Sequence, residues 1–262
     1  MKLSKIFSLF FLIIAMPLVL AHSEATSMWK TTQMYFIYAT IAISGIFITF
    51  SVVLRANVKK FEKYSKVLFY IIIIPVVFTS LFLIANTVYE NVNSVTKGPV
   101  HWHADFEIWN CGQKINPIDP EGLSNKVGSP VLHEHGDLRI HVEGIVKDYE
   151  DINLREFFHE LGGDLTENSL SVPTNDGLLN VRDGDLCNGE EGKVNIFVYR
   201  TRDEVVSQEK ITNLDEYIYS PYETVPPGDC IIVEFSQDKN STDKLCNSYK
   251  LAFESGEVRY GG

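Results

Sequence analysis

Histidine is the residue type whose placement in this chain points most directly to chemistry. Six of the seven histidines fall between His101 and His159, and four of them form two His-x-His pairs, His101 with His103 and His133 with His135. In an extended strand, residues i and i+2 point to the same face, so each pair presents two imidazoles together. Neutral imidazole is a ligand for copper, zinc, nickel and iron. The spacing therefore predicts a transition-metal site.

Two such pairs placed side by side would supply up to four imidazoles to one ion. We expect copper or zinc as the metal, and carboxylates nearby would complete or orient the site. A cluster of imidazoles that titrates near pH 6.5 and senses pH is the alternative. The expected ligands are His101, His103, His133 and His135, with His141 in reserve, and the nearby carboxylates are Glu107, Glu134 and Asp137.

Three classes of function are compatible with such a site. The leading hypothesis is a metal-binding protein without catalytic activity. A hydrolytic or oxidative metalloenzyme would need an open coordination position and a general base such as Glu107 or Glu134. A structural or pH-sensing subunit of a membrane complex is the third, and self-association is left open. The sequence contains no nucleophile elbow, phosphate-binding glycine loop or nucleotide fingerprint.

The charges are divided unevenly along the 262 residues. Residues 1–89 carry eight Lys and Arg against two Asp and Glu, whereas residues 90–262 carry fifteen against thirty-two. Binding to nucleic acid needs clustered Lys and Arg, so we expect no nucleic-acid partner. An acidic surface instead favours solubility and attracts cations.

Apolar runs in the basic part predict attachment to the lipid bilayer. Residues 1–21 have the basic start, apolar middle and small residue before the cut that are typical of a signal peptide, and cleavage would leave His22 at the N-terminus. Two uncharged runs follow, 33–54 and 67–89, and each is long enough to cross a bilayer as a helix. Residues 22–89 are therefore expected to form a two-helix anchor.

The loop between these runs sets the expected orientation. Residues 55–66 carry five Lys and Arg and one Glu, which places the loop in the cytoplasm by the positive-inside rule. Both mature termini then lie outside, with 90–100 as a linker and 101–262 as an extracytoplasmic domain. All four cysteines fall in this acidic part without a CxxC pair, so two disulfides of open pairing are expected there.

The outer domain is expected to be α+β and mostly β. Period-two patterns predict strands, which are followed by one main helix over 154–161 that Asn153 would cap and glycines would end. Further strands follow the helix, which indicates an α+β domain with one main helix. The expected strands are 101–109, 114–115, 138–143, 170–172, 193–200 and 230–235.

Two resemblances cover parts of this domain. The helix at 154–162, the strand at 194–199 and the turn at 226–229 before the last strand resemble the second half of a β-grasp domain, and a cupredoxin-like or other β-sandwich is the alternative. His101, His103 and Glu107 are also similar to the first cupin motif, although the downstream cupin segment is missing.

A third resemblance covers about sixty residues. The chain contains a first His-x-His, then His133-x-His135, and then an Ile-His-Val-Glu strand at 140–143. In this order the motifs resemble those of an uncharacterised group of exported archaeal and bacterial domains. The resemblance implies a histidine-rich extracytoplasmic domain, and no established activity comes with it.

Overall fold

A computed structural model describes residues 28–55, 58–123 and 125–261. The expected signal peptide at 1–21 and His22 lie outside the described residues. The chain divides into two compact units between Tyr89 and Glu90, and each unit is considered separately below.

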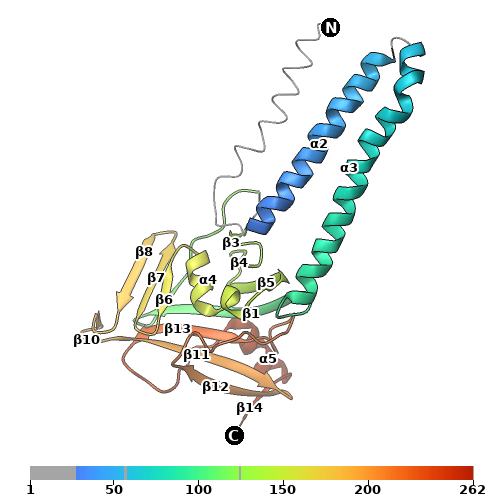
Figure 1. Cartoon of the computed structure of the whole chain (residues 1–262). Coiled ribbons are helices and arrows are strands. Elements are labelled where there is room, and N and C mark those ends of the chain that lie inside the picture. Colours follow the sequence, from blue (N-terminus) through green and yellow to red (C-terminus); the bar gives the residue numbers. More distant parts are fainter. Residues whose placement is uncertain (1–27, 56–57, 124, 262) are drawn as a thin grey trace. The chain divides into compact units, whose positions relative to one another are not determined.

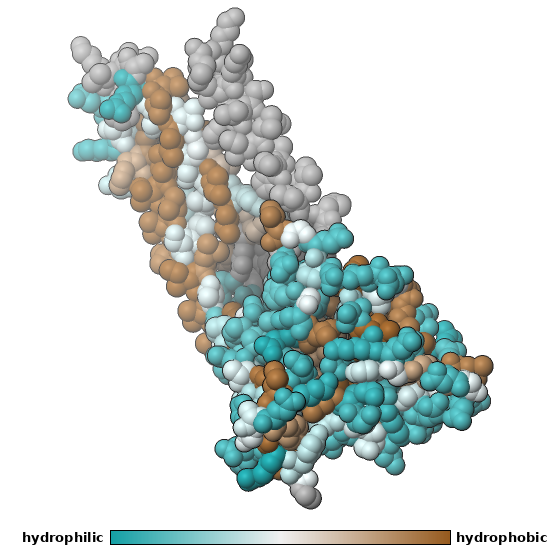
Figure 2. Space-filling view, turned by 180° about the vertical axis from the view of Figure 1, so that it is seen from behind, coloured by the Kyte–Doolittle hydropathy of each residue, from teal (hydrophilic) through white to brown (hydrophobic). Residues whose placement is uncertain are grey.

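The first unit contains the long helix α2 (Met28–Leu54) and most of the long helix α3 (Val58–Asn93), whose last residues belong to the second unit. Their segments Met34–Val53 and Glu62–Asn93 are long and apolar enough to cross a membrane. Large apolar side chains along both helices are exposed, and Figure 2 shows this apolar surface in brown. Such a surface is unusual in water and suits contact with lipid tails.

The boundaries of these helices differ from the expected ones. Helix α3 already begins at Val58, so most of the basic segment 55–66 is helical rather than a loop. At its other end α3 continues to Asn93, and the first strand begins at Pro99, so the linker expected over 90–100 is shorter. Lysines are good helix formers, which explains why a basic segment beside an apolar run continues its helix.

The second unit is built on one mixed sheet in the order β14-β12-β11-β13-β1-β5-β4-β3, with β2 paired to β1 (Figure 1). At its centre β1 runs parallel to β13 and antiparallel to β5. The strands are β1 (Pro99–Asn110), β2 (Gln113–Ile115), β3 (Val127–Gly128), β4 (Leu132–Glu134), β5 (Arg139–Ile145), β11 (Lys193–Arg202), β12 (Val205–Ile211), β13 (Cys230–Ser236) and β14 (Arg259–Tyr260).

Two smaller sheets complete the strand structure. One contains β6 (Asp164–Thr166), β7 (Ser169–Thr174) and β8 (Gly177–Arg182), and the other pairs β9 (Leu186–Cys187) with β10 (Glu190–Glu191). The described residues of this unit are therefore α+β and mostly β, as the sequence predicts. The expected strands within β1, β2, β5, β7, β11 and β13 are confirmed.

Different helices pack on the two faces of the large sheet (Figure 1). After a 3-10 turn at Tyr149–Ile152, α4 (Leu154–Glu160) buries Phe157 against Phe106 of β1, with ring centroids 5.1 Å apart. On the other face α5 (Asn247–Ser255) buries Tyr249 in a second core with Phe197 and Ile232. The expectation of one main helix is therefore wrong, because α5 is longer than α4.

Both expected disulfides are present. Cys111 after β1 is joined to Cys187 of β9, and Cys230 at the start of β13 is joined to Cys246 before α5. The second bond ties α5 to the central strand on which it packs. No cysteine in the described residues is free.

We predict that Asn153→Ala will lower the free energy of unfolding by about 1 kcal/mol, because it removes the cap of α4. The Asn153 Oδ1 accepts a hydrogen bond from the Glu156 N–H at 2.8 Å, and its Nδ2 donates to the Glu150 carbonyl. Urea unfolding of the full-length protein in detergent, followed by tryptophan fluorescence, would measure the change. Asn153→Asp is the matched control and should cost less, since it can still accept the bond from Glu156.

Candidate metal centre

Three histidines form a row across three neighbouring strands. In the antiparallel register, His103 of β1 is opposite His141 of β5, and His141 is in turn opposite His133 of β4. Residues that pair across antiparallel strands point to the same face. The ring of His141 consequently lies between the other two, with centroid distances of 4.5 Å to His103 and 5.4 Å to His133.

The other members of the two His-x-His pairs extend this row on the same face. His101 is opposite Glu143 in the register of β1 and β5, and its ring centroid lies 4.5 Å from that of His103. His135 follows β4 directly, with ring centroids 4.9 Å from His133 and 4.8 Å from His141.

Possible ligand atoms gather in two groups. Within each group, one such atom from every residue lies within 4.8 Å of those from the others. The first group contains His101, His103, His141 and Glu143, and the second contains His133, His135 and His141. Each His-x-His pair thus meets His141, which the sequence places only in reserve. That all five histidines bind metal stays a prediction.

Backbone carbonyls orient one imidazole in each group. The carbonyl of Glu223 lies in hydrogen-bond contact with His103 Nδ1, and the carbonyl of Asn125 with His135 Nδ1. A carbonyl only accepts, so each Nδ1 donates its proton and each neutral ring keeps its lone pair on Nε2. A backbone carbonyl behind the ring is the usual support of a metal-binding histidine.

Four imidazole nitrogens of the site are buried and have no hydrogen-bond partner among the described residues. They are His103 Nε2, His133 Nδ1, and both Nδ1 and Nε2 of His141. Buried polar atoms are nearly always paired in folded proteins, and an unpaired one costs roughly 1–3 kcal/mol. Several unpaired nitrogens gathered in one row of side chains are explained if an ion binds there.

The environment favours neutral rings at the centre of the row. Burial lowers the pKa of His141 to about 4, and the neighbouring His103 acts in the same direction. Burial, together with the positive charge of Lys126, also lowers the pKa of His133. A neutral ring has a free lone pair, which coordination to a metal requires.

Glu143 is the carboxylate closest to the histidines. Its Oε1 lies 3.0 Å from His101 Nε2 and 3.8 Å from His141 Nδ1, while its Oε2 lies 3.9 Å from His133 Nε2. The sequence interpretation missed Glu143 as a ligand. Its position two residues after His141 in one strand was the available signal, because that spacing places both side chains on one face.

The carboxylates named from the sequence lie elsewhere. Glu107 accepts hydrogen bonds from Lys114 Nζ at 2.7 Å and from Trp109 Nε1 at 2.9 Å. Glu134 is buried, its Oε2 accepts from the Gly136 N–H, and burial raises its pKa. Asp137 is the exception, because its Oδ2 lies 3.5 Å from His141 Nε2.

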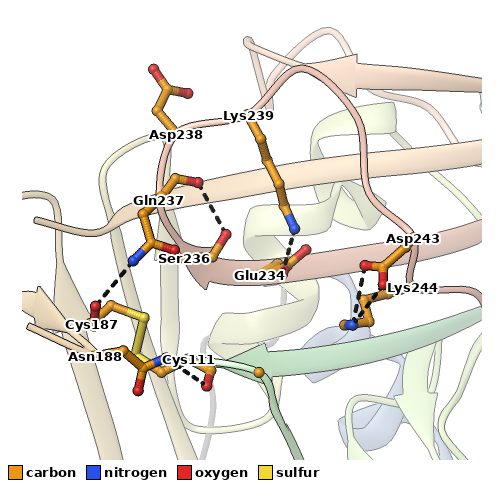
Figure 3. Close-up of a pocket in the computed structure, with 11 residues that line it drawn as sticks. Cys111, Cys187, Asn188, Glu234, Ser236, Gln237, Asp238, Lys239, Asp243 and Lys244 are labelled. Atoms are coloured by element: carbon orange, nitrogen blue, oxygen red, sulfur yellow. Dashed lines mark hydrogen bonds and ion pairs between the residues drawn. A yellow bond between two sulfur atoms is a disulfide. The ribbon is translucent and has the colours of Figure 1, made fainter. Parts of the chain in front are cut away.

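A cavity of about 260 Å³ lies at the opposite end of β1, around the Cys111–Cys187 disulfide (Figure 3). None of its lining residues is a histidine. Its buried carboxylate, Glu234, is paired with Lys239 Nζ at 2.6 Å and also accepts from Thr242. The cavity is therefore separate from the histidine site, and its buried carboxylate is already paired with a lysine.

No protein-family model matches the chain, and searches among curated proteins and solved structures found no similar protein. The resemblance to exported histidine-rich domains stays a prediction.

We predict that the metal-free protein loses stability as the pH falls from about 6.5 to about 4. The unfolded chain binds a proton at His141 near pH 6.5, whereas the folded chain binds it only near pH 4. The unfolded state therefore holds more protons across this interval, and each unit of pKa difference is worth about 1.4 kcal/mol.

Urea unfolding of chelator-treated protein at several pH values would test this. The variant His141→Gln should show a shallower pH dependence than the wild type, and His159→Gln on the exposed side of α4 is the matched control. Equal slopes for the wild type and His141→Gln would contradict the prediction.

Proposed function

We propose that this protein binds copper or zinc at the outer surface of a membrane, through paired histidines of its C-terminal unit. The observation that carries the proposal is the row His103–His141–His133, in which four buried imidazole nitrogens have no hydrogen-bond partner among the described residues. The groups formed around this row have the ligand types and spacing that could hold a metal ion.

The donor atoms favour Zn²⁺ or Cu²⁺ over Cu⁺. The two groups offer imidazole nitrogens and one carboxylate, and imidazole suits zinc and copper. Thiolates, which would select Cu⁺, are not offered, because the cysteines at 111, 187, 230 and 246 are all in disulfides.

We propose binding rather than catalysis because the two general bases that the sequence suggested, Glu107 and Glu134, are not at the site. Glu107 is held by Lys114 and Trp109, and Glu134 is bonded to the Gly136 N–H. A base must reach a metal-bound water or substrate to take its proton. Neither carboxylate belongs to the two groups of possible ligands.

We further propose a β-grasp architecture for the C-terminal unit. The order β5-β1-β13-β11, the parallel central pair β1 and β13, and α4 after the β1–β5 pair support it. In the alternative, a cupredoxin-like or other β-sandwich, two sheets pack face to face, whereas here helices α4 and α5 pack on the two faces of the large sheet.

The proposed orientation places the C-terminal unit outside the cytoplasm. The basic residues between the two apolar segments support it through the positive-inside rule. Two disulfides in the C-terminal unit also support it, since disulfides persist in oxidising compartments.

We predict that the purified full-length protein contains or binds zinc or copper, and that His103→Gln and His133→Gln each weaken binding by at least about tenfold. Each variant removes one of few ligands from a preformed site. Elemental analysis and competition with a chromogenic chelator would measure this. His159→Gln is the control and should bind like the wild type, and an equal loss in this variant would contradict the assignment.

We predict that a membrane-impermeant maleimide will label Ser207→Cys on intact cells but will label Lys63→Cys only after permeabilisation. Both positions are exposed, and the native cysteines are paired, so each variant presents one new thiol. If only Lys63→Cys is labelled on intact cells, the proposed orientation is wrong and the opposite one holds.

A further inference from the structure

The two groups of possible ligands share one residue, His141, and this bears on how many ions the site holds. We propose that the site is dinuclear, with one metal ion in each group and His141 between them. This inference rests on the proposed function and adds the number of ions and their shared ligand. The first ion would be bound by His101, His103 and Glu143, and the second by His133 and His135.

The number of ligands exceeds what one ion can use. The two groups together offer five histidines and one glutamate. Zinc takes four ligands in nearly all structural sites, and fewer from the protein where a position stays open. If the same side chains are divided between two ions, three of them bind the first ion and two bind the second. His141 is then an additional ligand of both ions.

Both nitrogens of His141 are placed to bind. Each is buried without a hydrogen-bond partner among the described residues, and each has a carboxylate oxygen nearby, Glu143 Oε1 at 3.8 Å from Nδ1 and Asp137 Oδ2 at 3.5 Å from Nε2. The two nitrogens of an imidazole point away from each other, and once the N–H proton is lost each has a lone pair, so one ring can then bind two ions only on its two separate sides. His103 and His133 flank this ring on the neighbouring strands, one from each group.

Glu143 also reaches both groups. Its Oε1 lies 3.0 Å from His101 Nε2 of the first group, and its Oε2 lies 3.9 Å from His133 Nε2 of the second. A carboxylate with one oxygen toward each ion reduces the repulsion between two cations.

The charges and protons balance in this arrangement. His141 is neutral before binding and carries one N–H proton; to bind two ions it releases that proton to solvent and becomes an imidazolate. The imidazolate and the Glu143 carboxylate then contribute two negative charges against two divalent ions. The remaining four histidines bind as neutral rings.

The test uses full-length protein in detergent, carrying His22→Ala so that a free N-terminal histidine cannot chelate copper. Cu²⁺ is added, unbound metal is removed by gel filtration, and the copper-to-protein ratio is measured. We expect two equivalents and, at full loading, an electron paramagnetic resonance spectrum altered by coupling between the two Cu²⁺ ions through His141.

Each outcome separates the two proposals. If no Cu²⁺ is bound, and a parallel loading with Zn²⁺ also leaves no bound metal, both the proposed function and this inference are overturned. A ratio of one would leave the proposed function intact and overturn the dinuclear site. Two equivalents whose spectrum is the simple sum of isolated Cu²⁺ ions would overturn the shared role of His141.

Single variants locate the two ions. His101→Gln should weaken the first site and His135→Gln the second, so that each binds one equivalent tightly and loses the coupling. Both positions are at least partly exposed, so we expect the fold to tolerate these changes. His159→Gln is the matched control and should keep two coupled ions, and its loss of either would overturn the assignment.

Discussion

The register of β5 against β1 and β4 is the constraint on which the site depends. It places His141 opposite both His103 and His133. A slip by one residue would move these side chains to the other face of the sheet. The opposite face opposes such a slip, because it buries Ile140 and Val142 almost completely in the core. The hydrophobic core therefore fixes the positions of the imidazoles that lie outside it.

A buried aspartate extends this control to the segment that supports His103. Asp229 accepts hydrogen bonds from Tyr217 Oη at 2.6 Å and the Ser220 N–H at 3.1 Å, and so holds the start of the segment 220–228. Farther along, the Tyr222 carbonyl accepts from the His103 N–H at 2.8 Å. Gly228 allows the two backbone segments to approach closely, because a Cβ there would lie 2.3 Å from the His103 carbonyl oxygen. Contacts that begin at the buried Asp229 thus position the segment that orients His103.

Local pattern predicted those features of the fold and site that depend on neighbours in sequence. The two His-x-His pairs project to one face and α4 begins after Asn153, because both follow from strand and helix periodicity. The central place of His141 could not be predicted, since it depends on strand pairing between segments about forty residues apart. Helix α5 was missed because its sequence is polar and its cap makes no side-chain hydrogen bond. Its position depends on the Cys230–Cys246 disulfide and on packing of Tyr249.

Exposure varies across the site, and this bears on how an ion would enter. The side chains of His101 and Glu143 are 52% and 41% exposed, whereas that of His133 is 3% exposed. The acidic unit attracts cations to its surface, and Glu143 is a charged group at the open edge beside His101. An ion would therefore meet His101 and Glu143 first and lose its water there. In the second group the half-buried rings of His135 and His141 lie beside the buried ring of His133, so an ion would meet these two rings before it reaches His133.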